Sequence, residues 1–126
     1  MKKTQKYHTL TKSEMQVMNL LWEMPLGASI HQILERYPEP KPAYTTVSTF
    51  LKILHCKQFV TIGKGQGKQH IFFPAVTRQE YTRRVMNEVK ENFFDGSASS
   101  LVRFFVQEEE LSPEEIHELL DLIEKD

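Results

Sequence analysis

The sequence lacks most of the features that mark a secreted or membrane-spanning chain. Its single cysteine, Cys56, excludes an intramolecular disulfide and fits a reducing compartment. No stretch approaches the roughly 20 consecutive apolar residues that a membrane-spanning helix needs. The basic N-terminus is not followed by the apolar run of a signal peptide. We therefore expect a cytoplasmic protein with no membrane insertion.

Signatures of enzymes and of metal sites are also scarce. Neither a cofactor fingerprint nor a Ser/His/Asp set at a recognisable spacing is present. Only His55 and Cys56 are adjacent among the potential metal ligands, and neighbouring helix residues point about 100° apart, so this pair would need further ligands. The glutamate run 108–110 is typical of a solvated connector between helices. We therefore expect no catalytic activity, no metal site and no cofactor.

Charge is distributed unevenly along a chain of 126 residues whose net charge is only −1. Residues 1–78 carry 11 Lys and Arg against 4 Asp and Glu, a net charge of +7. Residues 79–126 carry 5 against 13, a net charge of −8. A basic half of this kind indicates an anionic partner, most commonly nucleic acid.

The start of the chain predicts two helices, each with a complete start signal. Thr11 and Glu14 form a capping box for the first helix, which is expected to stop at Pro25. Its expected buried stripe comprises Met15, Met18, Leu21 and Trp22. Ser29 is the expected N-cap of the second helix. The apolar stripe of that helix comprises Ile30, Ile33, Leu34 and Tyr37, and it is closed by Pro38, Pro40 and Pro42.

The segment 41–60 is the stretch around which the chain is organised. Its apolar residues follow helical spacing and are Val47, Phe50, Leu51 and Leu54. The opposite face of this helix carries Thr45, Ser48, Thr49, Lys52 and Cys56. A solvated face usually carries long charged residues, whereas short hydroxyl residues suit close approach to another molecule. We interpret this segment as a DNA-recognition helix; the alternative is a threonine-rich surface on an ordinary core helix.

After this helix the apolar period changes from 3.6 to about 2, which predicts a β-hairpin. Its strands are expected at 59–62 and 71–73, on either side of a glycine-rich basic loop. The loop leads into a strand and has no Ser or Thr after Lys68, which argues against a phosphate-binding loop of the nucleotide type. Three helices followed by a basic hairpin are the layout of a winged helix. Lys64 and Lys68 of this wing are expected to contact phosphates; the alternative is a flexible turn with solvated lysines.

Three amphipathic helices are predicted after the hairpin. The first begins with a capping box at Thr77 and Glu80, ends at Asp95, and carries the stripe Tyr81, Val85, Val89 and Phe93. A strongly apolar helix over 100–106 follows. The last begins at the N-cap Ser112 and carries the stripe Ile116, Leu119, Leu120 and Ile123. So short a segment cannot bury three apolar stripes by itself, and we expect a second copy of the chain to complete the core.

These predictions combine into one architecture. The fold class is mainly α with a small β-hairpin, namely a winged helix-turn-helix followed by a C-terminal helical dimerisation region. We place the DNA-binding domain at residues 1–76 and the dimerisation region at residues 77–126.

With these features in place, the sequence resembles the penicillinase-repressor family, the BlaI/MecI type of winged-helix regulator. The match runs from about Leu10 to Ile123. Its most specific segments are Glu14–Trp22, Ala43–Thr49, and Ser100–Val106 leading to Leu111 and Ser112.

The resemblance implies a homodimeric repressor of β-lactamase or related sensor-protease operons that binds a palindromic operator in double-stranded DNA. The candidate DNA-binding residues of the recognition helix and the wing are Tyr44, Thr45, Thr46, Ser48, Thr49, Lys52, Lys64 and Lys68. The candidate dimerisation residues are Tyr81, Val85, Val89, Phe93, Leu101, Phe104, Phe105, Leu111, Ile116, Leu119, Leu120 and Ile123. The resemblance also implies cleavage triggered by a membrane sensor zinc protease, with that sensor or its downstream protease as a partner, and the family's cleaved bond falls at Phe104-Phe105.

The chain departs from the family pattern at two positions. Phe104 stands where cleaved members often have asparagine, and Gln58 replaces the usual glycine after the recognition helix. Release by cleavage at another bond, or by a ligand without proteolysis, is therefore a second hypothesis. A winged helix that binds protein is a third, and it predicts an apolar outer face on the recognition helix. The copper-responsive branch of the family has a cysteine-rich C-terminal metal site, and this tail has no cysteine, so copper sensing is not expected.

Overall fold

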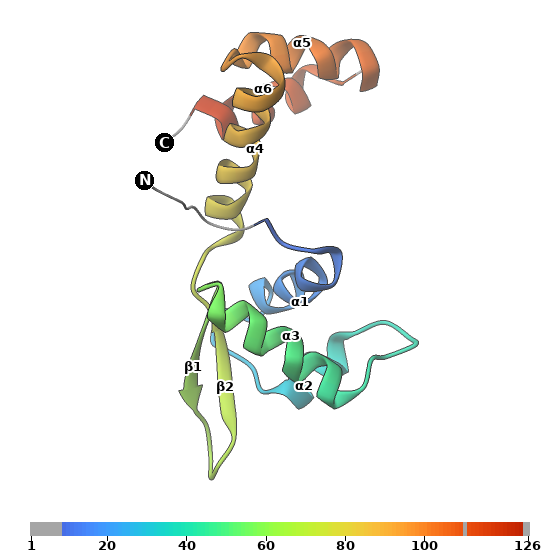
Figure 1. Cartoon of the computed structure of the whole chain (residues 1–126). Helices are drawn as coiled ribbons and strands as arrows, with labels where there is room; N and C mark the ends of the chain where they lie inside the picture. The colour runs from blue at the N-terminus through green and yellow to red at the C-terminus, as the bar shows by residue number, and fades with distance from the viewer. Residues whose placement is uncertain (1–8, 110, 125–126) are drawn as a thin grey trace. The chain divides into compact units, whose positions relative to one another are not determined.

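The structure is a computed structural model and describes residues 9–109 and 111–124 (Figure 1). In chain order its elements are α1 (Lys12–Trp22), α2 (Ile30–Arg36), α3 (Tyr44–Cys56), β1 (Val60–Lys64), β2 (His70–Pro74), α4 (Arg78–Phe94), α5 (Ala98–Glu109) and α6 (Pro113–Glu124). These elements divide into a first unit that ends at Arg78 and a second unit that starts at Gln79. A mainly α fold, with a winged helix followed by further helices, is therefore confirmed. No helix in the described ranges has the length and apolar character needed to span a membrane.

Helix α1 begins as its sequence predicts. The Thr11 hydroxyl accepts a hydrogen bond from the Glu14 amide at 3.2 Å, and the Glu14 carboxylate accepts one from the Thr11 amide at 3.0 Å. The predicted stripe was partly wrong, however, because α1 is rotated about its axis from the expected orientation. Its buried residues are Glu14, Val17, Met18 and Leu21, whereas Met15 and Trp22 are only half-buried. The helix also ends at Trp22, three residues before Pro25.

The inward-facing Glu14 forms an ion pair that the sequence did not predict. Its Oε1 atom lies 2.8 Å from the Nζ atom of Lys57, which caps the C-terminus of α3. Burial raises the pKa of the Glu14 carboxyl. The Lys57 ammonium and the Thr11 amide lower this pKa by more than burial raises it, so the net pKa lies below the ordinary value. The pair joins the first turn of α1 to the end of α3.

Helix α2 has capping groups at both ends. Ser29 and Gln32 exchange the two hydrogen bonds of a capping box, at 3.2 and 2.8 Å, which confirms the predicted N-cap. Beyond the other end, the Lys41 ammonium donates to the carbonyls of Leu34 and Tyr37 at 2.8 and 2.9 Å. A cation at these carbonyls satisfies acceptors that the helix leaves free and complements the helix dipole. The end of α2 therefore depends on Lys41 as well as on the prolines that follow.

Helix α3 packs three residues of its predicted stripe into the core. Val47, Leu51 and Leu54 are fully buried, while Phe50 is half-buried. At the end of α3, the amide of Phe59 donates to the carbonyl of Leu54 at 2.9 Å and the amide of Gln58 donates to the carbonyl of His55 at 3.0 Å. These two bonds form a Schellman motif, which requires a left-handed residue between them. Gln58 has a φ of 70° and fills this position.

The wing is an antiparallel hairpin whose register runs from Val60 paired with Pro74 to Lys64 paired with His70. The predicted strands were too short, because Gly63 and Lys64 also pair across the ladder. Only residues 65–69 remain in the loop. Backbone pairing therefore brings His70 and Lys64 to the same end of the hairpin.

An isolated β-bridge joins the middle of β2 to the segment just before α2. Ala28 and Phe72 exchange two backbone hydrogen bonds, at 3.0 and 2.8 Å. The preceding Gly27 has a φ of +92°, and a Cβ atom there would lie 2.5 Å from Cε2 of Phe73. Any other residue at position 27 would have to displace the Phe73 side chain, so glycine allows this segment to lie close to β2.

In the second unit, α5 packs against α6. Asp95 and Gly96, both with positive φ, separate α4 from α5, as the sequence predicts. The amide and hydroxyl of Ser112 exchange hydrogen bonds with Glu115 at 3.0 and 3.1 Å, which confirms the predicted start of α6. The α4 stripe is only partly covered: Tyr81 is buried, Val85 and Val89 are half-buried, and Phe93 is 76% exposed.

Candidate nucleic-acid interface

The outer face of α3 carries most of the predicted DNA-binding residues. The exposed ones are Tyr44, Thr45, Thr46, Thr49 and Lys52, and Ser48 is half-buried. The hydroxyl of Thr49 donates to the carbonyl of Thr45 at 3.0 Å, so its proton already has an acceptor within the helix. This face therefore combines short polar side chains with one tyrosine and one cation.

A groove of about 330 Å³ lies between the start of α2, helix α3 and the wing. It brings together Tyr44, Ser48 and Lys52 of α3 with Lys68 of the wing loop. Four of the eight candidate DNA-binding residues thus share one concave surface. Thr45, Thr46 and Thr49 are exposed on α3 outside its lining, and Lys64 is exposed at the end of β1.

The groove also contains residues that the sequence did not single out. His31 of α2 lies with its ring 5.0 Å from the ring of Tyr44, and His70 at the start of β2 lies 6.5 Å from the ring of Phe72. Gln69 completes the polar lining next to Lys68. No sequence pattern could have identified these histidines, because only the packing of α2 and the wing around α3 brings them together.

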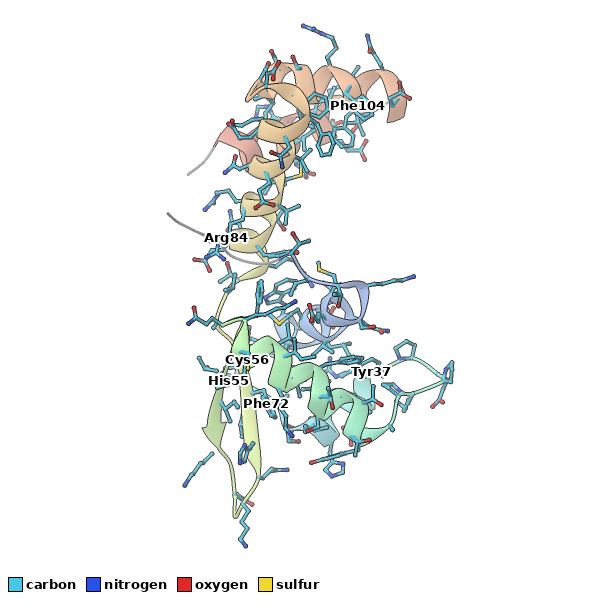
Figure 2. All side chains as sticks on the ribbon, viewed as in Figure 1. Tyr37, His55, Cys56, Phe72, Arg84 and Phe104 are labelled. Atoms are coloured by element: carbon cyan, nitrogen blue, oxygen red, sulfur yellow. The ribbon has the colours of Figure 1, made fainter. Side chains whose placement is uncertain are left out.

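The pair His55 and Cys56 lies at the C-terminal end of α3 (Figure 2). Both side chains are exposed, and neither lines the groove. Among the residues that the structure describes, no group of three or more His, Cys, Asp or Glu is arranged to hold a metal ion.

The second unit contains an apolar hollow of about 410 Å³ between α4 and α5. The predicted dimerisation residues that line it are Val89, Phe93, Leu101, Phe104 and Phe105. Phe94, which was not predicted, also lines it, and the Phe104 ring lies 5.7 Å from the rings of both Phe94 and Phe105. With Phe93 76% exposed and Phe104 47% exposed, this hollow presents aromatic surface to its surroundings.

The other predicted dimerisation residues do not line this hollow. Tyr81 is buried, and the half-buried ones are Val85, Leu111, Ile116, Leu119 and Leu120. The side chain of Ile123 lies outside the described part of the chain. The Phe104-Phe105 bond lies inside helix α5. Of the glutamate run, Glu108 and Glu109 belong to α5, so that part is helix and not a connector, while Glu110 lies outside the described residues.

A three-helix unit with a basic hairpin, followed by amphipathic helices with exposed aromatic residues, defines the class of winged-helix regulators. The profile of the family described as "Penicillinase repressor" matches residues 10–125. The chain therefore belongs to the penicillinase repressor family, which confirms the resemblance found in its sequence. Membership of a repressor family implies a regulatory, non-enzymatic protein.

Relatives in this family match nearly the whole chain. The methicillin resistance regulatory protein MecI of Staphylococcus aureus strain N315 is 28% identical over 121 residues, which are 95% of this chain and 97% of MecI. MecI of Staphylococcus epidermidis shows the same identity and coverage. The penicillinase repressor of Bacillus licheniformis is 24% identical over 116 residues, which are 92% of this chain and 90% of that protein.

Proposed function

We propose that this protein is a homodimeric transcriptional repressor that binds a palindromic DNA operator through α3 and the wing. The observation that carries the proposal is the groove in which Tyr44, Ser48 and Lys52 of α3 meet Lys68 of the wing. It lies in a part of the chain whose net charge is +7. An exposed helix of this kind fits the major groove, while lysines beside it contact phosphates.

Base readout would come from the threonines of α3. Their hydroxyls can bond to base edges, and their methyl groups can contact the methyl group of thymine. Thr45, Thr46 and Thr49 are exposed and suit this role. Lys52, Lys64 and Lys68 would hold phosphates and fix the orientation of α3 without reading sequence.

A protein-binding winged helix is the rival function, and the outer face of α3 favours DNA. A protein partner would require a mainly apolar surface there, yet its exposed residues include three threonines and a lysine. Tyr44 and Ile53 are the large apolar residues of α3 with substantial exposure, at 46% and 39%, and they do not form a continuous apolar stripe with the threonines between them.

Two substitutions test the DNA-binding proposal after operator fragments have been selected from genomic DNA. Lys68→Ala should weaken binding to all duplexes to a similar extent, because it removes a phosphate contact. Thr46→Ala should change the preferred sequence, because it removes a base contact. A wild-type protein that shifts no duplex at about 50 mM salt, where phosphate contacts are strongest, would refute the proposal.

Dimerisation is assigned to residues 77–126 and DNA binding to residues 1–76. Exposed aromatic residues around the α4–α5 hollow, with the half-buried apolar residues of α6, give a second copy an apolar surface to cover. A two-fold dimer would read half-sites about 10 bp apart or a multiple of this. Sedimentation equilibrium of the full chain should therefore give a dimer, and a monomer at micromolar concentration would contradict the assignment.

For regulation, we propose that the protein controls β-lactamase or related sensor-protease operons and that cleavage at Phe104-Phe105 ends repression. The bond lies inside α5, so a protease would reach it only after local opening of the helix. Cleavage would separate α6 from α4, loosen the dimer and remove the avidity of two linked half-sites. Mass spectrometry of the protein from induced cells tests this: fragments ending at Phe104 support cleavage, and intact chains during transcription support release by a ligand.

A further inference from the structure

The groove between α2, α3 and the wing has a histidine on two of its walls. His31 is exposed on α2, beside Tyr44 at the start of α3. His70 is exposed at the first position of β2, beside the wing loop. Lys52 and Lys68 line the same groove, and none of the residues that the structure describes in its lining is acidic.

A groove that combines two lysines with an apolar floor and no carboxylate in its described lining suits a row of phosphates. Histidine carries a positive charge only below about pH 6.5, and both of its ring nitrogens then donate hydrogen bonds. A nearby phosphate favours this charged form, since an opposite charge stabilises an ion. Binding of a phosphate chain in the groove would therefore be coupled to proton uptake by His31 and His70.

We propose that the groove holds one phosphate backbone of the bound DNA and that His31 and His70 contact it as imidazolium ions, so that DNA affinity rises as the pH falls. This inference rests on the proposed DNA-binding function and adds two contact residues and a pH response to it. The titratable or charged groups that face the groove are His31 from α2, Tyr44 and Lys52 from α3, and Lys68 and His70 from the wing. Of these residue types, only histidine ordinarily changes charge between pH 5 and 8.

The size of the response follows from counterion release. Each neutralised phosphate contributes about −0.9 to the slope of log K against log salt, which corresponds to roughly eightfold in affinity at about 0.1 M salt. Two imidazolium contacts should thus steepen the slope by about 1.8 and tighten binding by roughly 60-fold. A residue with only a structural role would not change the salt slope in this way.

The test measures fluorescence anisotropy of the full chain with a labelled mixed-sequence duplex of about three helical turns. Titrations over a salt series are run at about pH 5.5 and about pH 8, on either side of the histidine titration. His31→Gln and His70→Gln should each remove about half of the difference between the two slopes. His117→Gln, an exposed histidine of α6 in the other unit, is the matched control and should leave the difference unchanged.

A second variant keeps the charge at all pH values. The double change His31→Lys and His70→Lys should bind at about pH 8 nearly as tightly as the wild type binds at about pH 5.5. Circular dichroism and thermal melting show whether each variant is folded. A wild type with equal slopes at the two pH values overturns the inference, and so does a slope difference that persists when both histidines are glutamine. Absence of duplex binding at low salt at both pH values would refute the proposed DNA-binding function itself, and the inference with it.

Discussion

Replacing Gln58 with glycine should stabilise the first unit, although it removes a whole side chain. Gln58 has a φ of 70° in the Schellman motif that ends α3. The left-handed conformation costs an L-residue about 1–2 kcal/mol, which glycine does not incur. Glycine also has more freedom in the unfolded chain, which offsets about 0.4–1 kcal/mol of that gain. We therefore expect the free energy of unfolding to rise by about 0.5–1 kcal/mol.

Tryptophan fluorescence can measure this change in the full chain. Trp22 is the only tryptophan of the sequence, and its indole N–H donates to the carbonyl of Val76 at 2.8 Å within the first unit. Its emission during urea unfolding therefore reports on this unit. With a urea dependence of about 1–2 kcal/mol per M, the midpoint of Gln58→Gly should rise by roughly 0.5 M.

Two control variants isolate the role of backbone conformation. Gln58→Ala keeps a Cβ atom in the left-handed position, so it should leave the urea midpoint nearly unchanged. His55→Gly introduces glycine three residues earlier, inside α3, where it should cost about 0.5–1 kcal/mol. If Gln58→Gly lowers the midpoint as His55→Gly does, the positive φ of Gln58 is not a cost and the reasoning is wrong.

Three further substitutions test other parts of the structure. Glu14→Gln should cost about 1–3 kcal/mol at neutral pH, because Lys57 loses its charged partner. Since folding lowers the pKa of Glu14, this stabilisation is complete above its unfolded pKa of about 4.3 and disappears as the pH falls through the folded pKa. If the urea midpoints of the wild type and of Glu14→Gln still differ in strong acid, the ion pair is not the source of the stabilisation. Phe93→Ala should weaken the dimer by about 1.5–3 kcal/mol per copy, which raises its Kd, measured by sedimentation, by roughly 10²–10⁴. Leu26 is 91% exposed in the first unit, and the control Leu26→Ala should have no effect on this Kd. If both reduce dimerisation equally, Phe93 has no special role. Gly27→Ala should destabilise the first unit by about 2–4 kcal/mol, because its Cβ would overlap a ring of β2, and a melting temperature equal to that of the wild type would argue against this overlap.

The helix starts could be predicted from the sequence because their hydrogen bonds are local. Thr11, Ser29 and Ser112 were predicted as N-caps, and each exchanges hydrogen bonds with a residue three positions further along the chain. The apolar periods of α3 and the wing were equally informative, since they specify one buried face. These signals were sufficient for the fold class and for the outer face of α3.

Features that depend on distant partners could not be predicted in this way. The position of Glu14 in the first turn of α1 predicts its capping bond to Thr11. Its second hydrogen bond, from Lys57 43 residues away, has no counterpart in the local sequence. Nor does an apolar period fix the rotation of α1 precisely enough to choose between Val17 and Trp22 as the buried residue. His31 and His70 carry no recognisable pattern either, because their common groove exists only after α2 and the wing have packed around α3.

The two ends of the wing differ in how much change they can accept during evolution. Its base, the paired strands, is restricted by the Ala28–Phe72 bridge and by Gly27, where any larger residue would overlap the side chains of Phe73 and Ile71. At the tip, Gly67 has a φ of +64° and favours glycine, but the neighbouring Gln66 and Lys68 are exposed and have no such restriction. Insertions or charge changes at the tip should therefore accumulate without loss of the fold, while the base stays nearly invariant. A lineage of such repressors could retune its strength of DNA binding through the tip alone.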